Sequence, residues 1–374
     1  MDTPTQSKRL LSLDAFRGIT IAAMILVNNP GSYAAVYREL QHTTWNGWTF
    51  TDCIFPFFLF IVGVSMTFSF AWRMDRGDSL AKIEEQVARR TIILFCLGLV
   101  LNAFPIFHLS TLRIPGVLQR ISLCYFFTSL IVLKSSVKAQ GLWLTGFLFL
   151  YWLAMEYIPV PELGAGVYEP GKNLAAHVDS LFLDGHMWSE YGTWDPEGLL
   201  STIPAISTTL FGVMTSHWLR SGYSGEKKTA SMLAAGLFLL LLGKVLDIWV
   251  PINKNIWTSS FSIFMGGMAT IFLAVFYWLI DVKNWKRWAH PFMMFGTNSI
   301  AIYFLSEILD TIWRFIWVTQ RNGGKMNLRD YIYHSCFAPL ASTINASLLF
   351  AVTYLLLMFA VAWIMWKKRW LVKI

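Results

Sequence analysis

NNPGSYAAVYRELQHTTWNGWTFTDCIFPF, residues 28–57, leaves one apolar segment and enters the next through a polar and aromatic loop. Near its second border the loop holds His42, and the carboxylate of Asp52 follows ten residues later. A neutral imidazole beside a carboxylate can form a general base and the group that orients it. A lone loop histidine is usually only solvated, but the aromatic segment 45–52 and its amide, Asn46, raise the case for catalysis. We predict that the remaining chain brings two substrates to this stretch.

The composition is that of a polytopic membrane protein. Of the 374 residues, 55% are hydrophobic and 14% are charged, whereas a soluble chain carries about 25% charged residues. The formal net charge of +8 lies in short segments beside apolar runs, so it reports topology and not a nucleic-acid partner. The four cysteines have no paired short spacing, and the seven histidines form no HxxxH or HExxH motif, so we expect no bound metal.

Ten apolar stretches are long enough to cross a hydrocarbon core, which takes roughly 20 helical residues. The chain is therefore expected to be an all-α membrane protein, a single domain (1–374) with a bundle of about ten transmembrane helices. Loops 30–51 and 159–199 are placed outside the cytoplasm, the longer one following the fifth span. No cleavage pattern follows Lys8 and Arg9, so the first helix is expected to stay uncleaved. The expected spans are 11–29, 52–72, 91–108, 116–133, 141–158, 200–219, 230–250, 259–280, 291–317 and 337–366.

Charge sets the predicted orientation. With the N-terminus in the cytoplasm, 19 Lys and Arg fall in inside segments and 8 in outside segments. Because positive charge accumulates on the cytoplasmic side, both termini are predicted to be cytoplasmic, in a bacterial inner membrane. One outside loop disagrees with this rule, and a wrongly drawn ninth span is the simplest cause. Its basic residues are Arg314, Arg321, Lys325 and Arg329.

The 159–199 loop mixes Gly and Pro turns with aromatic and acidic side chains. A long loop is more often functional than a short one, and ring faces beside carboxylates suit an aminosugar cation. We name Asp195 and Glu197 as substrate-binding candidates, together with Trp45 and Asn46 from the first loop. The alternative is a solvated cap over the bundle.

Ionisable residues inside spans mark functional sites or internal pairs. Arg17 lies three residues after Asp14, so it either forms an ion pair with that residue or binds a phosphate entering from the cytoplasm. Arg120 lies about one turn into the fourth span and needs a partner, which can be Gln119, a carboxylate or a ligand. Both arginines are candidates for binding the phosphates of a donor substrate.

Two further polar groups, Asn298 and Glu307, occupy the ninth span about 13 Å apart along a helix. They either line one channel, Asn298 at a cofactor site and Glu307 at a substrate site, or form a polar stripe that holds helices together. Lys244 and Asp247 repeat the three-residue spacing, and we expect a structural pair.

Several motifs resemble, in order and through nearly the whole chain, the heparan-α-glucosaminide N-acetyltransferase family. They are LDAFRG (13–18), HTTWNGWTFTDCIFPFFLFIVG (42–63), RIPGVLQR (113–120), DPEGLLSTI (195–203) and TNSIAIYF (297–304). The lysosomal members carry a luminal region and a further span that precede this part. By position, the family's essential histidine falls on His42, its partner asparagine on Asn28 and its conserved acid on Asp52. Where the lysosomal enzyme resembles GHE, this chain has Leu305-Ser306-Glu307, so a second assisting histidine is absent.

The resemblance implies acetyl transfer from cytoplasmic acetyl-CoA, a co-substrate, to the amine of a terminal glucosamine across the membrane. In our hypothesis His42 takes the amine proton, Asp52 fixes its tautomer, and Asn28 or Asn46 donates to the thioester oxygen. An acetyl-imidazole intermediate on His42 is the alternative mechanism. The rival function is a sugar or muropeptide-fragment permease, which needs no catalytic histidine. Expected partners are the aminosugar or glycan, membrane lipid and, by family analogy, a second copy of the chain.

Overall fold

The computed structural model describes residues 10–319 and 324–372, and Arg321 therefore lies outside the described residues, as do Lys8 and Arg9. Nearly all of the regular structure is helical, as predicted. The elements are α1 (Leu11–Asn28), α2 (Phe50–Asp75), α3 (Leu80–Ala103), α4 (Val117–Lys134), α5 (Val137–Tyr157), α6 (Leu174–Leu183), α7 (Thr202–Leu219), α8 (Gly225–Leu246), α9 (Ser259–Phe276), α10 (His290–Thr297), α11 (Ser299–Phe315), β1 (Trp317–Thr319), β2 (Lys325–Asn327), α12 (Leu328–Ile332) and α13 (Thr343–Lys367).

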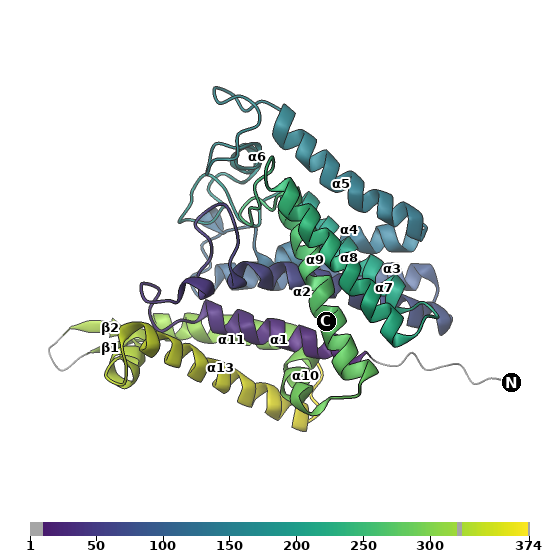
Figure 1. The fold of residues 1–374 in the computed structure, drawn as a ribbon. Coiled ribbons are helices and arrows are strands. Elements are labelled where there is room, and N and C mark those ends of the chain that lie inside the picture. Colours follow the sequence, from purple (N-terminus) through teal and green to yellow (C-terminus); the bar gives the residue numbers. More distant parts are fainter. Residues whose placement is uncertain (1–9, 320–323, 373–374) are drawn as a thin grey trace.

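The helices pack in two groups that meet along α1 and α2. One group holds α2 to α5 and α7 to α9, and the other holds α1, α10, α11 and α13 (Figure 1). The first helix crosses α10 closely, because neither helix carries a side chain at the crossing. A Cβ added to Gly18 would lie 1.7 Å from the carbonyl oxygen of Phe292, and one added to Gly296 would lie 2.1 Å from that of Asp14. These two positions therefore require glycine.

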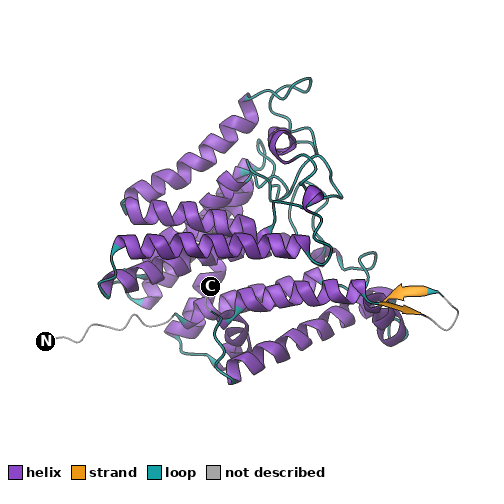
Figure 2. Ribbon diagram, turned by 180° about the vertical axis from the view of Figure 1, so that it is seen from behind, coloured by secondary structure: helices purple, strands orange, loops and turns teal. Residues whose placement is uncertain are grey.

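The connecting segments sort into two ends. We call one the loop end, where residues 29–49, 104–116, 158–201, 247–258 and 316–342 gather; Figure 2 shows the irregular chain concentrated there. The loop-end segments are joined by Trp45–Tyr168, Arg113–Asp195, Lys254–His42 and Arg314–Tyr33 contacts. The opposite end is joined by Lys134–Glu84, Lys283–Glu226 and Asn298–Trp370 contacts. Consecutive long helices thus alternate in direction, as the charge pattern requires.

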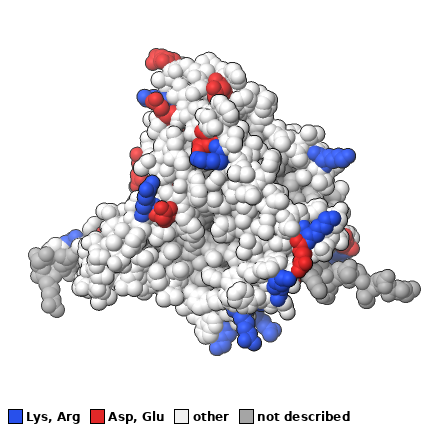
Figure 3. Space-filling view, viewed as in Figure 1, with Lys and Arg blue, Asp and Glu red and all other residues white. Residues whose placement is uncertain are grey.

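Seven of the described helices are long and apolar enough to span a membrane, and the bent pair α10–α11 makes an eighth. Long helices also occupy the remaining two expected positions, α5 and α7, but with less apolar sequences, so ten spans stays a prediction. Most of the face in Figure 3 is uncharged, and the charged side chains on it occur in a few small groups. This surface is that of a protein whose flanks contact lipid.

Three differences from the predicted boundaries are the most informative. The third helix begins at Leu80 instead of residue 91, because a helix continues past the apolar run into a charged segment. The expected ninth span is two helices bent by 71° at Asn298. The last helix starts at Thr343, after Pro339, and not at residue 337.

Two arginines of the basic loop that disagreed with the charge rule share one carboxylate. Asp310, near the end of α11, accepts from Arg314 at 2.6 Å and from Arg329 at 2.8 Å. Arg329 is buried and also donates to the carbonyl oxygen of Pro30, just after α1. Arg314 and Arg329 therefore connect α11 to the chain after α1.

Candidate active site

The predicted contact between His42 and Asp52 is present. His42 Nδ1 lies 2.7 Å from Asp52 Oδ1. The other carboxylate oxygen, Oδ2, accepts from the backbone N–H groups of Thr43 and Thr49, each at 3.0 Å. Thr49 is the N-cap residue of α2 and Asp52 is the N3 residue of its capping box, so Asp52 is a partner both of the helix start and of the imidazole.

This arrangement selects one tautomer of the histidine. Since Oδ1 is an acceptor at hydrogen-bond distance, Nδ1 carries the proton that the two atoms share, and Nε2 keeps its lone pair. Asp52 is fully buried, whereas 53% of the His42 side chain is exposed. The His42 ring is therefore held by the buried Asp52 at Nδ1, and the other side of the ring is open to solvent.

A lysine from the loop between α8 and α9 reaches the same imidazole. Lys254 Nζ lies 3.3 Å from His42 Nδ1. Packing around the ring, together with the charge of Lys254, lowers the pKa of His42 below its ordinary value of 6.5, although Asp52 acts to raise it. Burial likewise lowers the pKa of Lys254. Sequence reasoning did not select Lys254; the available signal was that it is the single charged residue of segment 248–258.

Asn46 is held by the same loop. Asn253 Nδ2 donates to Asn46 Oδ1 at 3.0 Å, and the backbone of Gly47 donates to Ile252 O at 2.7 Å. Because its carbonyl oxygen accepts from Asn253, the NH₂ group is the part of the Asn46 amide that can act as a donor. The predicted role of Asn46 as a donor is compatible with this geometry.

The acidic residues of the long loop serve different purposes. Arg113 donates to Asp195 at 2.8 and 2.6 Å and to Glu197 at 2.6 Å. The Asp195 side chain has no exposed surface and also accepts from the Trp188 backbone. It cannot contact a sugar in this conformation, so the expectation that Asp195 binds substrate is replaced by a structural role.

Glu197 is the loop acid that faces the centre. Burial would raise its pKa, but nearby cations, Arg113 foremost, hold it below the usual range, and its charge in turn acts on His42. Only 9% of its side chain is exposed. Sequence reasoning did not identify Arg113 as the partner of both acids.

Aromatic side chains line the same end. Trp45 donates from Nε1 to the carbonyl oxygen of Tyr168 at 2.7 Å and packs edge-on against Trp194. Tyr191 stacks on Trp194 with ring centroids 4.2 Å apart and is 45% exposed. Trp45 thus ties the two loops together, while Tyr191 presents the open ring edge of the group.

The two arginines expected to share phosphate binding lie at different depths. Arg17 contacts Asp14, Gly296 O and Ser65 of α2. Arg120 instead donates to Gly198 O of the long loop and to Ser201 just before α7, and it lies over the ring of Trp257. It is therefore a loop-end residue and cannot join Arg17 at one phosphate group.

The polar groups of the bent span also separate. Asn298, at the bend, donates to Trp370 O and accepts from the Val372 backbone, so it fixes the chain after α13. Glu307 accepts from Asn28 at 3.3 Å, which links α11 to the end of α1. Among the described residues no hydrogen bond joins Asn28 to His42. The polar-stripe alternative accounts for both contacts.

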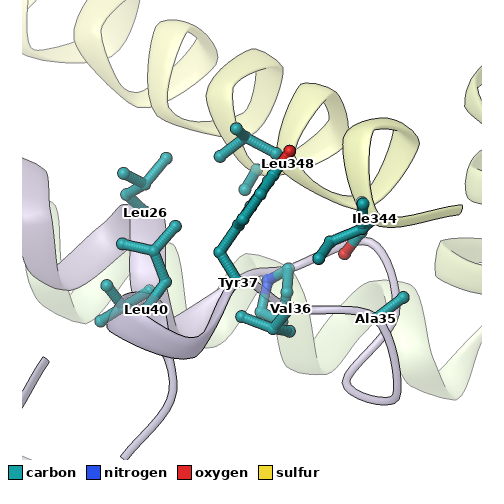
Figure 4. Close-up of a pocket in the computed structure, with 11 residues that line it drawn as sticks. Leu26, Ala35, Val36, Tyr37, Leu40, Ile344 and Leu348 are labelled. Carbon is teal, nitrogen blue, oxygen red and sulfur yellow. The ribbon is translucent and has the colours of Figure 1, made fainter. Parts of the chain in front are cut away.

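Two apolar recesses lie beside α1. One is lined by the end of α1, residues 35–40 and the start of α13, with Leu26, Tyr37 and Leu348 among its walls (Figure 4). It holds neither member of the His42–Asp52 pair. The other lies between α1, α2, α4 and α11, where Met24 and Tyr303 face it. This second recess lies along α1 between Arg17 and Asn28.

The fold and the site define a multi-helix membrane protein with a carboxylate-oriented histidine at one end of its bundle. The family model described as "Heparan-alpha-glucosaminide N-acetyltransferase, catalytic" matches residues 9–250. Relatives named heparan-alpha-glucosaminide N-acetyltransferase, from Mus musculus and Homo sapiens, are each 31% identical over 369 and 371 residues respectively. Each alignment covers 84% of this chain and 55% of the relative, so the chain spans about half the length of these curated relatives.

The chain therefore belongs to the heparan-alpha-glucosaminide N-acetyltransferase family, which confirms the resemblance found in its motifs. The matched range includes His42, Asp52 and the Arg113 cluster. Lys254 and Glu307 lie beyond it.

Proposed function

We propose that this protein transfers an acetyl group from cytoplasmic acetyl-CoA to the amine of a terminal glucosamine or related aminosugar at the loop end. The observation that carries the proposal is the His42–Asp52 contact, with its open imidazole, in a chain of this family. The relatives' names supply the acceptor class. The loop end is then the extracytoplasmic side, in a bacterial inner membrane with both termini in the cytoplasm.

The chemistry needs a base and an oxyanion donor. The amine nitrogen attacks the thioester carbonyl, His42 Nε2 takes the amine proton, and the carbon–sulfur bond breaks as the amide forms. The imidazolium can return its proton to the departing CoA thiolate. Asn46 is the better placed donor for the developing oxyanion, because Asn253 already orients its amide. General-base assistance of this kind contributes about 10²–10⁴-fold.

The donor approaches from the opposite end in this proposal. Arg17 remains the candidate for a CoA phosphate, since a planar guanidinium suits that group. The small apolar recess between α1, α2, α4 and α11 lies along α1 between Arg17 and the loop end, and an uncharged thioester arm would have to widen it to pass. Arg120 belongs to the loop-end structure and has no place in donor binding.

The acceptor occupies the exposed side of His42. Tyr191 offers an aromatic edge to a sugar, and Glu197, which pairs with Arg113, is the long-loop acid whose charge acts on His42. Glu307 and Asn28 lie on α11 and α1, and we place them at the inner wall of the acceptor site.

The test is acetyl transfer from labelled acetyl-CoA to glucosamine by the purified protein. We expect label on the sugar amine, and a loss of about 10²–10⁴-fold in His42→Ala. His108→Ala, a matched change at an exposed histidine of the loop end, should keep wild-type activity. Near-normal transfer by His42→Ala would refute the assignment of His42 as the general base. No transfer by wild type, with protein-dependent uptake of the sugar into vesicles, would favour the permease.

A further inference from the structure

We propose that Lys254 is a positioning residue that sets the protonation state of His42, its cation opposing protonation of the ring so that Nε2 stays free. The inference rests on the proposed function, in which His42 is the base. It starts from one geometric fact: Lys254 Nζ and Asp52 Oδ1 both lie within hydrogen-bond distance of His42 Nδ1.

A ring nitrogen cannot serve both groups as hydrogen-bond partners. It offers either a proton or a lone pair. The Asp52 contact, at 2.7 Å, requires the proton, because both carboxylate oxygens can only accept. Lys254 therefore cannot donate to Nδ1 at 3.3 Å. It acts on the imidazole as a nearby positive charge, without a hydrogen bond to the ring.

The lysine is held in place by its own loop. Asn253 Oδ1 accepts from the Ile256 backbone at 3.2 Å, while its Nδ2 donates to Asn46. Asp247, at the end of α8, accepts from the Ile252 backbone at 2.6 Å and from Lys244, the pair predicted to be structural. The loop is thus fastened on both sides of Lys254, which directs the side chain to His42.

The charges that face His42 come from three elements. Asp52 on α2 favours the imidazolium, and so does Glu197 from the loop before α7. Lys254 from the α8–α9 loop is the cation that opposes them. Arg113 neutralises much of the Glu197 charge by its ion pair. Without Lys254, the ring would face two anions and would hold its proton more tightly.

The experiment measures the titration of His42 directly. The full-length protein is labelled at histidine, placed in nanodiscs and followed by NMR across pH, with His42→Gln identifying the signal. In Lys254→Met we expect the midpoint to move to higher pH, and the acid limb of the kcat/KM profile to move in the same direction. Lys254→Arg should stay near wild type. The matched control is Lys172→Met, an exposed lysine of the loop end that pairs with Glu169.

An unchanged His42 midpoint in Lys254→Met would overturn the proposal. So would a uniform loss of kcat at all pH values with the acid limb unmoved, which would indicate contact with reacting atoms or loss of structure. Lys254→Gln repeats the test with a shorter neutral side chain should the Met variant fail to fold. Absence of acetyl transfer by wild type would refute the proposed function alone, since the NMR midpoint decides the Lys254 coupling separately.

Discussion

Asp52→Asn should abolish most of the transfer while leaving the fold intact. The asparagine carbonyl has to take the place of Oδ2, because that position accepts from the backbone N–H groups of Thr43 and Thr49. Its NH₂ group then falls where Oδ1 lay, 2.7 Å from His42 Nδ1. It donates to Nδ1, the ring proton moves to Nε2, and the base is lost.

The size of the loss follows from that tautomer change. General-base help contributes about 10²–10⁴-fold, and the corresponding Asp→Asn change in a Ser-His-Asp enzyme costs about 10⁴ in kcat. Stability should change little, because the asparagine carbonyl oxygen keeps the capping-box contact with the Thr49 backbone. The assay is kcat with saturating acetyl-CoA, beside thermal unfolding of the same preparation.

A matched control removes a helix cap elsewhere. Ser79 accepts from the backbone of Lys82 at the start of α3, at the opposite end of the bundle. Ser79→Ala should cost about 1 kcal/mol of stability and keep wild-type kcat. If Asp52→Asn retained kcat within a few-fold of wild type, the argument from the tautomer would be refuted.

Three further outcomes are expected. The base must be neutral to act, and the surroundings of His42 lower its pKa. We therefore expect kcat/KM to rise with pH and to reach its plateau at a lower pH than an imidazole with the ordinary pKa of 6.5 would give. A plateau displaced to higher pH would contradict this. Arg113→Met leaves two carboxylates without their partner and should lower the free energy of unfolding by about 3–5 kcal/mol, whereas an unchanged thermal midpoint would show that the cluster is not structural. Asn46→Ala should lower kcat by about 10²-fold without changing KM for acetyl-CoA; a rise in KM alone would place Asn46 in binding.

The sequence predicts the helices better than it predicts their ends. Apolar length marks where the chain crosses lipid, and every expected position holds a long helix or, for the ninth, a bent pair. Hydropathy does not indicate where a helix continues into water, and α3 therefore begins eleven residues before the predicted start of its span. The bend at Asn298 depends on contacts with the chain after α13, some 70 residues away, which no local pattern contains.

Contacts in the site between residues close in sequence were also easier to predict than contacts between distant residues. The pairs His42–Asp52, Asp14–Arg17 and Lys244–Asp247 lie within ten residues of each other, and each predicted contact is present. The catalytic role of the first pair stays a prediction.

Partners that are distant in the chain were out of reach of sequence reasoning. Lys254 is 212 residues from His42, and Arg113 is 82 residues from Asp195. Residue type alone also left the acids of the long loop equivalent. Folding distinguishes them, because Asp195 is buried against an arginine while Glu197 turns toward the centre.

The most direct test of the central claim is sidedness in sealed vesicles of known orientation. Labelled acetyl-CoA is confined to the side of the termini and glucosamine to the side of the loop end. The account predicts label on the sugar amine, dependent on His42, with the CoA moiety staying on its own side. Transfer only when both substrates share one side, or passage of unmodified sugar without acetylation, would contradict it.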